Sequence, residues 1–186
     1  MDELHEAKWQ WRRKIADLKK ACPTETLHAL STTICRRLEK MPLFRQAKSI
    51  AAYYALEGEV QTAGFIEYWR SEKKIFLPVT EGDKLRLAPY TGRKSLREGA
   101  FHIMEPAAAE LSPEMPEIDL MIVPGLAFDR QRNRLGRGKG LYDRLLSEFS
   151  VITVGICFDF QLFDRIPAGT DDRKMDWIIT ENEIIC

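Results

Sequence analysis

The middle of the chain reads VPGLAFD at residues 123–129 and, after three further residues, NRLGRGKGLYDR at residues 133–144. An apolar run over residues 118–123 leads into this stretch and predicts a buried strand. Beyond the stretch, apolar side chains recur at the spacing of one helix face. They are Leu141, Tyr142, Leu145, Leu146 and Phe149. The stretch therefore connects a buried strand to a helix through a glycine-rich loop.

Three glycines alternate with Arg137 and Lys139 in this loop, and Arg134 stands just before them. Glycines allow successive backbone N–H groups to turn toward one point, where the start of a helix adds partial positive charge. With three cationic side chains, such a loop has the chemistry of a polyphosphate receptor. Asp143, one turn into the helix, is placed to hold a divalent cation beside the phosphates. The pattern indicates an enzyme that uses ATP and Mg²⁺.

The same loop also fits a tight turn with solvated charges. It lacks the G-x-x-x-x-G-K-[ST] spacing of a Walker A motif. It also lacks the G-x-G-x-x-G fingerprint that opens a dinucleotide-binding unit. Spacing alone therefore leaves phosphate binding and a structural turn equally open.

Composition sets limits on the class of protein. The 186 residues predict one domain over 1–186, large enough to bury a core without disulfides or metal. Lysine plus arginine equals aspartate plus glutamate, 28 each, so no overall field favours nucleic acid. Four scattered cysteines without a C-x-x-C pair predict reduced thiols and no structural zinc. We expect a cytoplasmic monomer without a membrane segment, because the N-terminus is polar and no long heptad pattern occurs.

Helical spacing covers the first forty residues in two segments that Pro23 separates. A further helix is predicted after Thr62, which is suited to cap it, and residues 91–117 are predicted to form a long loop. The predicted strands cover residues 49–55, 75–79 with Pro78 at the end, 84–88, 118–123, 151–156 and, last, 175–180. Alternating strands and helices predict an α/β domain with three αβα layers, a largely parallel central sheet and Rossmann-like topology.

Five segments, in order along the chain, resemble the 5-formyltetrahydrofolate cyclo-ligases, also called methenyltetrahydrofolate synthetases. The most specific is Pro-Gly-x-x-Phe-Asp with Asn-Arg-Leu-Gly-Arg-Gly-Lys-Gly-x-Tyr-Asp, within residues 124–143. The others are KWQWR at 8–12, residues 54–62 ending in Glu-Val-x-Thr, residues 99–106 similar to Gly-x-x-x-Ile-x-Glu-Pro, and Asp172 followed by Met175-Asp176.

The chain departs from the family pattern at single positions. Many bacterial members have Tyr and Gly where this chain has Arg137 and Lys139, although the Arg/Lys version also belongs to the family. Trp11 replaces a Leu, and Leu141 replaces a common Tyr, which removes an aromatic contact there. Asp171 stands where a His often precedes the carboxylate, which leaves the role of that position open.

The resemblance implies conversion of 5-formyltetrahydrofolate to 5,10-methenyltetrahydrofolate, with ATP cleaved to ADP and phosphate. The γ-phosphoryl group would activate the formyl oxygen as a leaving group, and N10 would close the ring. The implied nucleotide contacts are Lys8, Trp9, Gln10, Trp11 and Arg12 in the helical segment 1–40, with Arg134, Leu135, Gly136, Arg137, Gly138, Lys139, Gly140, Leu141 and Tyr142 in the loop.

The resemblance also implies roles for single residues. Arg137 or Lys139 would lie where charge builds during phosphoryl transfer. Glu59 would accept two parallel N–H bonds from the 2-amino group and N3 of the pterin, with Tyr54 packed beside the ring. Asp143 and Asp172 would ligate Mg²⁺.

Two other classes of function compete with the cyclo-ligase. One is a non-catalytic nucleotide- or folate-binding relative, against which the retained carboxylates Asp143 and Asp172 argue. The other is a sugar-phosphate isomerase or CoA-transferase-like enzyme on a similar layout, because fold does not fix chemistry. The sequence does not reveal how many glutamates the preferred folate carries.

Overall fold

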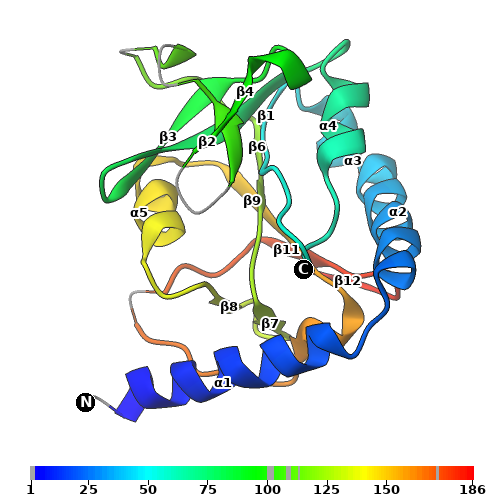
Figure 1. The fold of residues 1–186 in the computed structure, drawn as a ribbon, viewed down its shortest axis with the longest axis vertical. Helices are drawn as coiled ribbons and strands as arrows, with labels where there is room; N and C mark the ends of the chain where they lie inside the picture. Colours follow the sequence, from blue (N-terminus) through cyan, green and yellow to red (C-terminus); the bar gives the residue numbers. More distant parts are fainter. Residues whose placement is uncertain (1–2, 100–102, 108–109, 113, 171) are drawn as a thin grey trace.

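A computed structural model gives the fold and describes residues 3–99, 103–107, 110–112, 114–170 and 172–186. The strands of its main sheet are β1 (Ser49–Ala51), β2 (Lys74–Glu81), β3 (Lys84–Pro89), β6 (Leu120–Val123), β9 (Ile152–Ile156), β11 (Trp177–Ile179) and β12 (Ile184–Ile185). They lie in the order β12-β11-β9-β6-β1-β2-β3 (Figure 1). The edge strands β3 and β12 run antiparallel to their neighbours, and the five inner strands are parallel.

The order of the parallel strands determines where a ligand site is expected. Numbered along the chain, they follow the order 2-1-3-4-5 of a doubly wound sheet. The direction of winding reverses between β1 and β6, and such sheets bind ligands at the carboxyl ends of the two strands at that point. The predicted α/β class with a largely parallel central sheet is confirmed.

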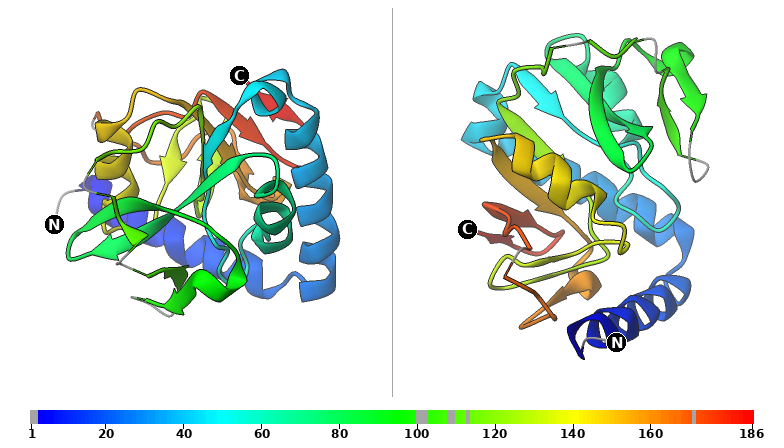
Figure 2. Two further views of the ribbon diagram at one scale, coloured as in Figure 1. Left: turned by 90° about the horizontal axis from the view of Figure 1, so that it is seen from above. Right: turned by 90° about the vertical axis from the view of Figure 1, so that its left-hand side faces the viewer.

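Helices cover both faces of the sheet (Figure 2). The helices α2 (Thr24–Lys40), α3 (Pro42–Gln46) and α4 (Ala63–Trp69) lie on one face, and α5 (Leu141–Glu148) lies on the other. Successive strand residues point to opposite faces, so Ile122 of β6 packs in the same cluster as Phe44 of α3. Val123 packs instead with Leu145 of α5. Two apolar cores therefore hold the layers together.

The first helix, α1 (Glu3–Lys20), packs on a second sheet below the main one (Figure 1). That sheet consists of β7 (Ala127–Asp129), β8 (Arg134–Leu135) and β10 (Leu162–Phe163). Ile15 is fully buried against Ala127 and Leu135, and the Trp11 ring meets Phe163 edge to face at 4.7 Å. The connection from the buried strand to α5 therefore contains a β-hairpin as well as the predicted loop.

Asp129 fixes this hairpin from inside. It is fully buried, and its Oδ1 accepts the N–H groups of Gln131 at 3.0 Å and Asn133 at 2.9 Å. Its Oδ2 accepts the Asn133 side-chain amide at 2.9 Å and the Ile166 N–H at 3.1 Å. The Asp that ends VPGLAFD is therefore a structural residue, which holds β8 at the entrance to the glycine-rich loop.

Three local predictions need correction. The strand predicted over 49–55 ends at Ala51, and the Thr62 hydroxyl donates to the Tyr53 carbonyl at 2.5 Å instead of capping α4. Pro78 lies inside β2, opposite Leu87 of β3. The Pro78 nitrogen faces the edge of β2 that pairs with β1, where the Phe76 carbonyl accepts the Ala52 N–H. Because β1 has ended before it reaches Pro78, the missing N–H of proline costs no ladder hydrogen bond.

Two predicted boundaries also change. The region 91–117 contains a 3-10 turn, η1 (Arg93–Ser95), and a hairpin of β4 (Leu96–Glu98) and β5 (Met104–Pro106). A second 3-10 turn, η4 (Asp159–Gln161), precedes β10, and β12 follows the strand predicted to be last. Among the helices of the described ranges, none has the length and apolar content needed to cross a membrane.

Candidate active site

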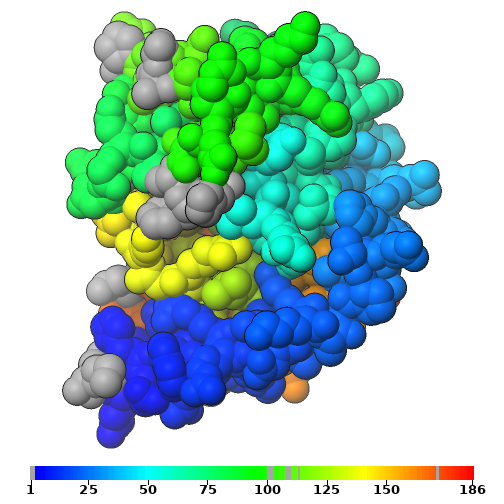
Figure 3. Space-filling model, viewed as in Figure 1, coloured from blue at the N-terminus to red at the C-terminus, as the bar shows by residue number. Residues whose placement is uncertain are grey.

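A cavity of about 560 Å³ opens beside the carboxyl ends of β1 and β6, the position expected from the strand order. Its walls come from α1, the segment after β1, the β2–β3 hairpin, β5 and the loop that leads into α5. In the space-filling view the yellow loop and helix start lie between the blue α1 and the green and cyan segments above (Figure 3). The volume suits a small-molecule ligand.

Most residues predicted for the site line this one cavity. They are Lys8, Arg12, Tyr54, Glu59, Arg134, Leu135, Gly136, Arg137, Gly138, Lys139, Gly140, Leu141, Tyr142, Asp143 and Asp172. The fold therefore brings together four segments that are far apart in the sequence.

Trp9, Gln10 and Trp11 do not line the cavity. Helix residues four apart share a face, so Lys8 and Arg12 face the cavity while the residues between them turn away. Trp9 is half exposed beneath the Arg13 guanidinium, and Gln10 is exposed and donates to Glu6 at 3.2 Å. Trp11 belongs to the core beneath α1. The cavity lining thus gives no support to a nucleotide contact at these three positions, which stays a prediction.

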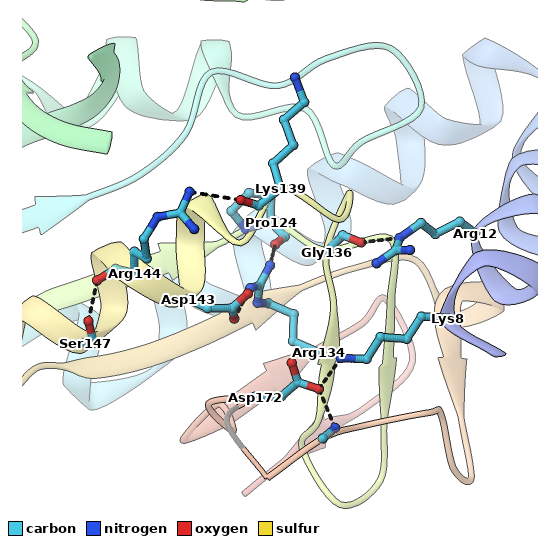
Figure 4. Close-up of polar contacts among 11 residues, drawn as sticks. Lys8, Arg12, Pro124, Arg134, Gly136, Lys139, Asp143, Arg144, Ser147 and Asp172 are labelled. Carbon is cyan, nitrogen blue, oxygen red and sulfur yellow. Dashed lines mark hydrogen bonds and ion pairs between the residues drawn. The ribbon is translucent and has the colours of Figure 1, made fainter. Parts of the chain in front are cut away.

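Arg12 ties α1 to the glycine-rich loop. Its Nε donates to the Gly136 carbonyl at 3.0 Å (Figure 4). Gly138 has a φ of +98°, and a Cβ there would lie 3.1 Å from Cζ of Arg12. Gly140 is left-handed with a φ of +64° at the start of α5. The N–H groups of Gly136, Gly138 and Gly140 donate to no acceptor in the described chain, so they remain available to an anion.

An ion pair between a nearly buried guanidinium and a half-buried carboxylate supports the start of α5. The Arg134 side chain is 4% exposed, and its Nη2 lies 2.6 Å from Oδ1 of Asp143 (Figure 4). Its Nη1 contacts the Pro124 carbonyl at 3.4 Å, and its buried Nε has no partner among the described residues. Arg134 is therefore an anchored cation at the floor of the cavity.

Asp172 is the second carboxylate, after Asp143, at this end of the cavity. Its Oδ2 accepts from Lys8 Nζ and from the Gly169 N–H, each at 2.6 Å. Partial burial by itself raises the pKa of Asp172, but the bonds from Lys8 and Gly169 outweigh it, so its pKa lies below the ordinary value. In the described ranges no three His, Cys, Asp or Glu side chains gather as a metal cluster.

Glu59 lies at the other end of the cavity and is paired with the loop. Its Oε1 lies 2.8 Å from Nη2 of Arg137, and its Oε2 accepts the Leu56 N–H at 3.0 Å. Burial raises the pKa of Tyr142, and Glu59 adds to the increase, so Tyr142 stays a neutral phenol. The loop thus contacts both ends of the cavity.

Lys19, near the end of α1, was not predicted as a site residue. Its aliphatic stem packs on Gly58, where an added Cβ would lie 3.3 Å from Cδ of Lys19. Burial lowers the pKa of Lys19, nearby Glu59 opposes this change, and Arg137 adds to it. A lysine in the last turn of a helix is ordinarily solvated, so the sequence carried no signal for this position.

The wall opposite α1 was also missed, because the predicted strands 75–79 and 84–88 were given no site role and β5 fell in the predicted loop 91–117. Pro78 and Leu85 of the β2–β3 hairpin and Met104 of β5 give it apolar surface. Glu105 lines the cavity too, and its Oε2 accepts the Thr80 N–H at 3.1 Å. Residues 100–102 of the predicted Gly-x-x-x-Ile-x-Glu-Pro motif, and Asp171, lie outside the described residues.

Both the sequence and the fold are similar to those of known proteins. A profile of the 5-formyltetrahydrofolate cyclo-ligase family matches residues 4–181. A probable 5-formyltetrahydrofolate cyclo-ligase of Schizosaccharomyces pombe is 28% identical over 174 residues, covering 83% of this chain and 85% of its own. A 5-formyltetrahydrofolate cyclo-ligase of Haemophilus influenzae is 34% identical over 133 residues, covering 67% and 71%. The NMR structure of Aquifex aeolicus 5,10-methenyltetrahydrofolate synthetase matches with a TM-score of 0.85 and 33% identity, covering 96% of this chain and 91% of that one.

Proposed function

The chain belongs to the 5-formyltetrahydrofolate cyclo-ligase family and is an enzyme of that kind, and from this premise we propose how its residues carry out the reaction. The proposed reaction transfers the γ-phosphoryl group of ATP to the formyl oxygen of 5-formyltetrahydrofolate. N10 then attacks the formyl carbon and loses its proton, and the C–O bond breaks to release phosphate. The products are 5,10-methenyltetrahydrofolate, ADP and phosphate.

One observation carries the proposal, namely that a single cavity joins a cationic, glycine-rich loop to a buried carboxylate. Phosphoryl transfer needs positioning and charge neutralisation more than covalent help from the protein. Lys8, Arg12, Arg134, Arg137 and Lys139 give the cavity wall a concentration of positive charge. This charge suits a triphosphate, whereas the isomerase or transferase alternatives need no nucleotide.

At the nucleotide end, the free N–H groups of the loop and the side chains of Lys8 and Arg12 would bind the phosphates. Arg137 or Lys139 would neutralise the charge that develops on the transferring group. Arg134 would act from below, since its guanidinium is anchored by Asp143. In the loop, Arg134 is thus an anchored cation, and Arg137 and Lys139 are more exposed ones.

The donor set at this end fits Mg²⁺. Mg²⁺ in nucleotide enzymes takes one or two carboxylates, with phosphate oxygens and waters completing its octahedron. Asp143 and Asp172 line the same cavity and would supply those carboxylates. When bound, the ion would neutralise phosphate charge. Arg134 and Lys8 hold the two carboxylates in place before any ligand arrives.

At the folate end, Glu59 would accept the 2-amino group and N3 of the pterin, and Tyr54 would pack beside the ring. The apolar side chains of Pro78, Leu85 and Met104 would cover the flat parts of the substrate on the opposite wall. This wall has the chemistry that an aromatic, uncharged ring system needs.

The test mixes the protein with Mg-ATP and 5-formyltetrahydrofolate and follows the near-ultraviolet absorbance of the methenyl product. We expect product only when ATP is present, with one ADP formed for each methenyl group. Omitting ATP, or chelating the divalent cation, should abolish the signal. Folded protein that forms no product, or that forms it without consuming ATP, would refute the proposal.

A further inference from the structure

The ion pair of Arg137 and Glu59 joins two parts of the site that the proposed reaction keeps separate. Arg137 comes from the phosphate loop, whereas Glu59 follows β1 at the folate end, 78 residues earlier. The Glu59 side chain is 9% exposed and that of Arg137 is 53% exposed. Both residues line the cavity, and the guanidinium is the more exposed member of the pair. A ligand that reaches Glu59 through the cavity therefore meets Arg137 there.

The pterin and Arg137 offer Glu59 the same pattern of donors. The 2-amino group and N3 of a pterin form an N–C–N edge with two parallel N–H bonds, as a guanidinium does. Glu59 already accepts the Leu56 N–H at Oε2 and Arg137 at Oε1, so both oxygens are engaged. The two N–H groups of the pterin therefore compete with Arg137 for Oε1 of Glu59.

On the basis of the proposed function, we propose that Arg137 exchanges partners. It bonds Glu59 while the folate site is empty, and it bonds nucleotide phosphate once the pterin has displaced it from Glu59. Folate binding then supplies a cation to the phosphate site at the moment when both substrates are present. Without folate, the same contact keeps Arg137 from the nucleotide and closes the pterin position. Each substrate consequently strengthens the binding of the other, because coupling between two sites is reciprocal.

The loop allows this exchange. Arg137 stands between Gly136 and Gly138, and its side chain is half exposed, so it can turn without disturbing the core. Arg134, three residues earlier, is instead held with 4% of its side chain exposed. One cation of the loop is thus held in the interior, and the other is half exposed between two glycines.

Lys19 lowers the cost of the exchange. A buried carboxylate that loses its cation is strongly disfavoured. Lys19 packs its stem against Gly58, beside Glu59, and its charge interacts with both Glu59 and Arg137. When Arg137 leaves, Lys19 remains as a countercharge for Glu59 and loses the repulsion from Arg137.

The experiment measures folate and nucleotide affinities by titration calorimetry, each ligand alone and with the other present, using Mg²⁺ with a non-hydrolysable ATP analogue. In the unmodified protein we expect the analogue to tighten folate binding about tenfold, within the usual range of coupling between sites. Arg137→Gln should bind folate alone at least as tightly as the unmodified protein, and its coupling factor should fall toward one. Lys139→Gln removes the same charge two residues away and should lower nucleotide affinity while keeping the coupling.

The reciprocal variant is Glu59→Gln, which breaks the ion pair and leaves Arg137 in place. It should bind the nucleotide analogue alone more tightly than the unmodified protein does. Weaker folate binding by Arg137→Gln with intact coupling, or unchanged nucleotide binding by Glu59→Gln, would overturn the exchange. Methenyl formation by the unmodified protein is assayed in parallel. Its absence contradicts the proposed function, whereas activity without coupling contradicts the exchange alone.

Discussion

Lys8 Nζ lies 2.6 Å from Oδ2 of Asp172, although 164 residues separate the two in the chain. The pair joins the exposed first helix to the segment before β11, on the wall where the nucleotide is expected. Both side chains are mostly buried, so the contact is better protected from solvent than an ordinary surface ion pair. It therefore contributes to the docking of α1 as well as to the site.

The first prediction concerns pH and this pair. The pKa of Asp172 is lowered in the folded protein, so its stabilising effect is complete above the ordinary carboxyl pKa of about 3.9 and is lost as pH falls through the lower folded value. Lys8→Met removes the main cause of that lowering and should reduce the free energy of unfolding at pH 7. The difference from the unmodified protein should shrink below about pH 4. Urea unfolding between pH 3 and pH 7 measures it, with Lys20→Met on the same helix as control; a difference independent of pH contradicts the assignment.

The second prediction concerns Asp129, which accepts bonds from three residues of the loop sheet and its surroundings. Asp129→Ala leaves several buried donors without an acceptor, and each such donor costs about 1–3 kcal/mol. We expect the free energy of unfolding to fall by about 3 kcal/mol or more in urea titrations. Asp164→Ala is the control, because its side chain is 99% exposed and its loss should cost less than about 0.5 kcal/mol. Equal losses in the two variants would show that Asp129 does not fix the hairpin.

The sequence predicts the parts of this fold that have a clear period. Continuous apolar strands and the apolar faces of α1, α2 and α5 are visible because each buries one side in a core. The short strands β7, β8 and β10 are not visible, because strands of two or three residues have no measurable alternation. Pro78 was misplaced for a different reason, since only the tertiary structure shows on which side β2 loses its neighbour.

The site divides in a similar way. Motif spacing finds the loop from Arg134 to Asp143, because all its residues are contiguous in the sequence and line the same cavity. It does not separate Trp9 from Lys8 and Arg12, because the side chains of a contiguous helical motif point in all directions and only one helix face lines the cavity. It does not find the pairing of Arg137 with Glu59 or the place of Lys19, because these depend on how distant segments pack.

The third prediction compares two glycines with positive φ. Gly138 (φ +98°) packs against Arg12, whereas Gly82 (φ +63°), in the β2–β3 turn, has no neighbouring atom within 4 Å of an added Cβ. Alanine is strained at either position by about 1–2 kcal/mol. Only Gly138→Ala also displaces Arg12, so it should raise the KM for ATP several-fold while Gly82→Ala leaves KM unchanged. Steady-state kinetics and thermal melts measure both effects; an equal KM for the two variants would mean that Arg12 and the loop do not shape the nucleotide site.

The fourth prediction concerns Asp143, which has two roles in the proposed site. Asp143→Asn keeps an oxygen for the bond from Arg134 but leaves that nearly buried guanidinium without a countercharge, which should lower the free energy of unfolding by about 1–3 kcal/mol. If Asp143 also ligates Mg²⁺, the variant should bind the ATP analogue with similar affinity in Mg²⁺ and in chelator, whereas the unmodified protein binds more tightly in Mg²⁺. Calorimetric titrations in both buffers measure this, and Glu148→Gln at the far end of α5 is the control for a lost charge. Full magnesium dependence in Asp143→Asn, together with the expected loss of stability, would leave Asp143 only the task of holding Arg134 and would assign the metal to Asp172.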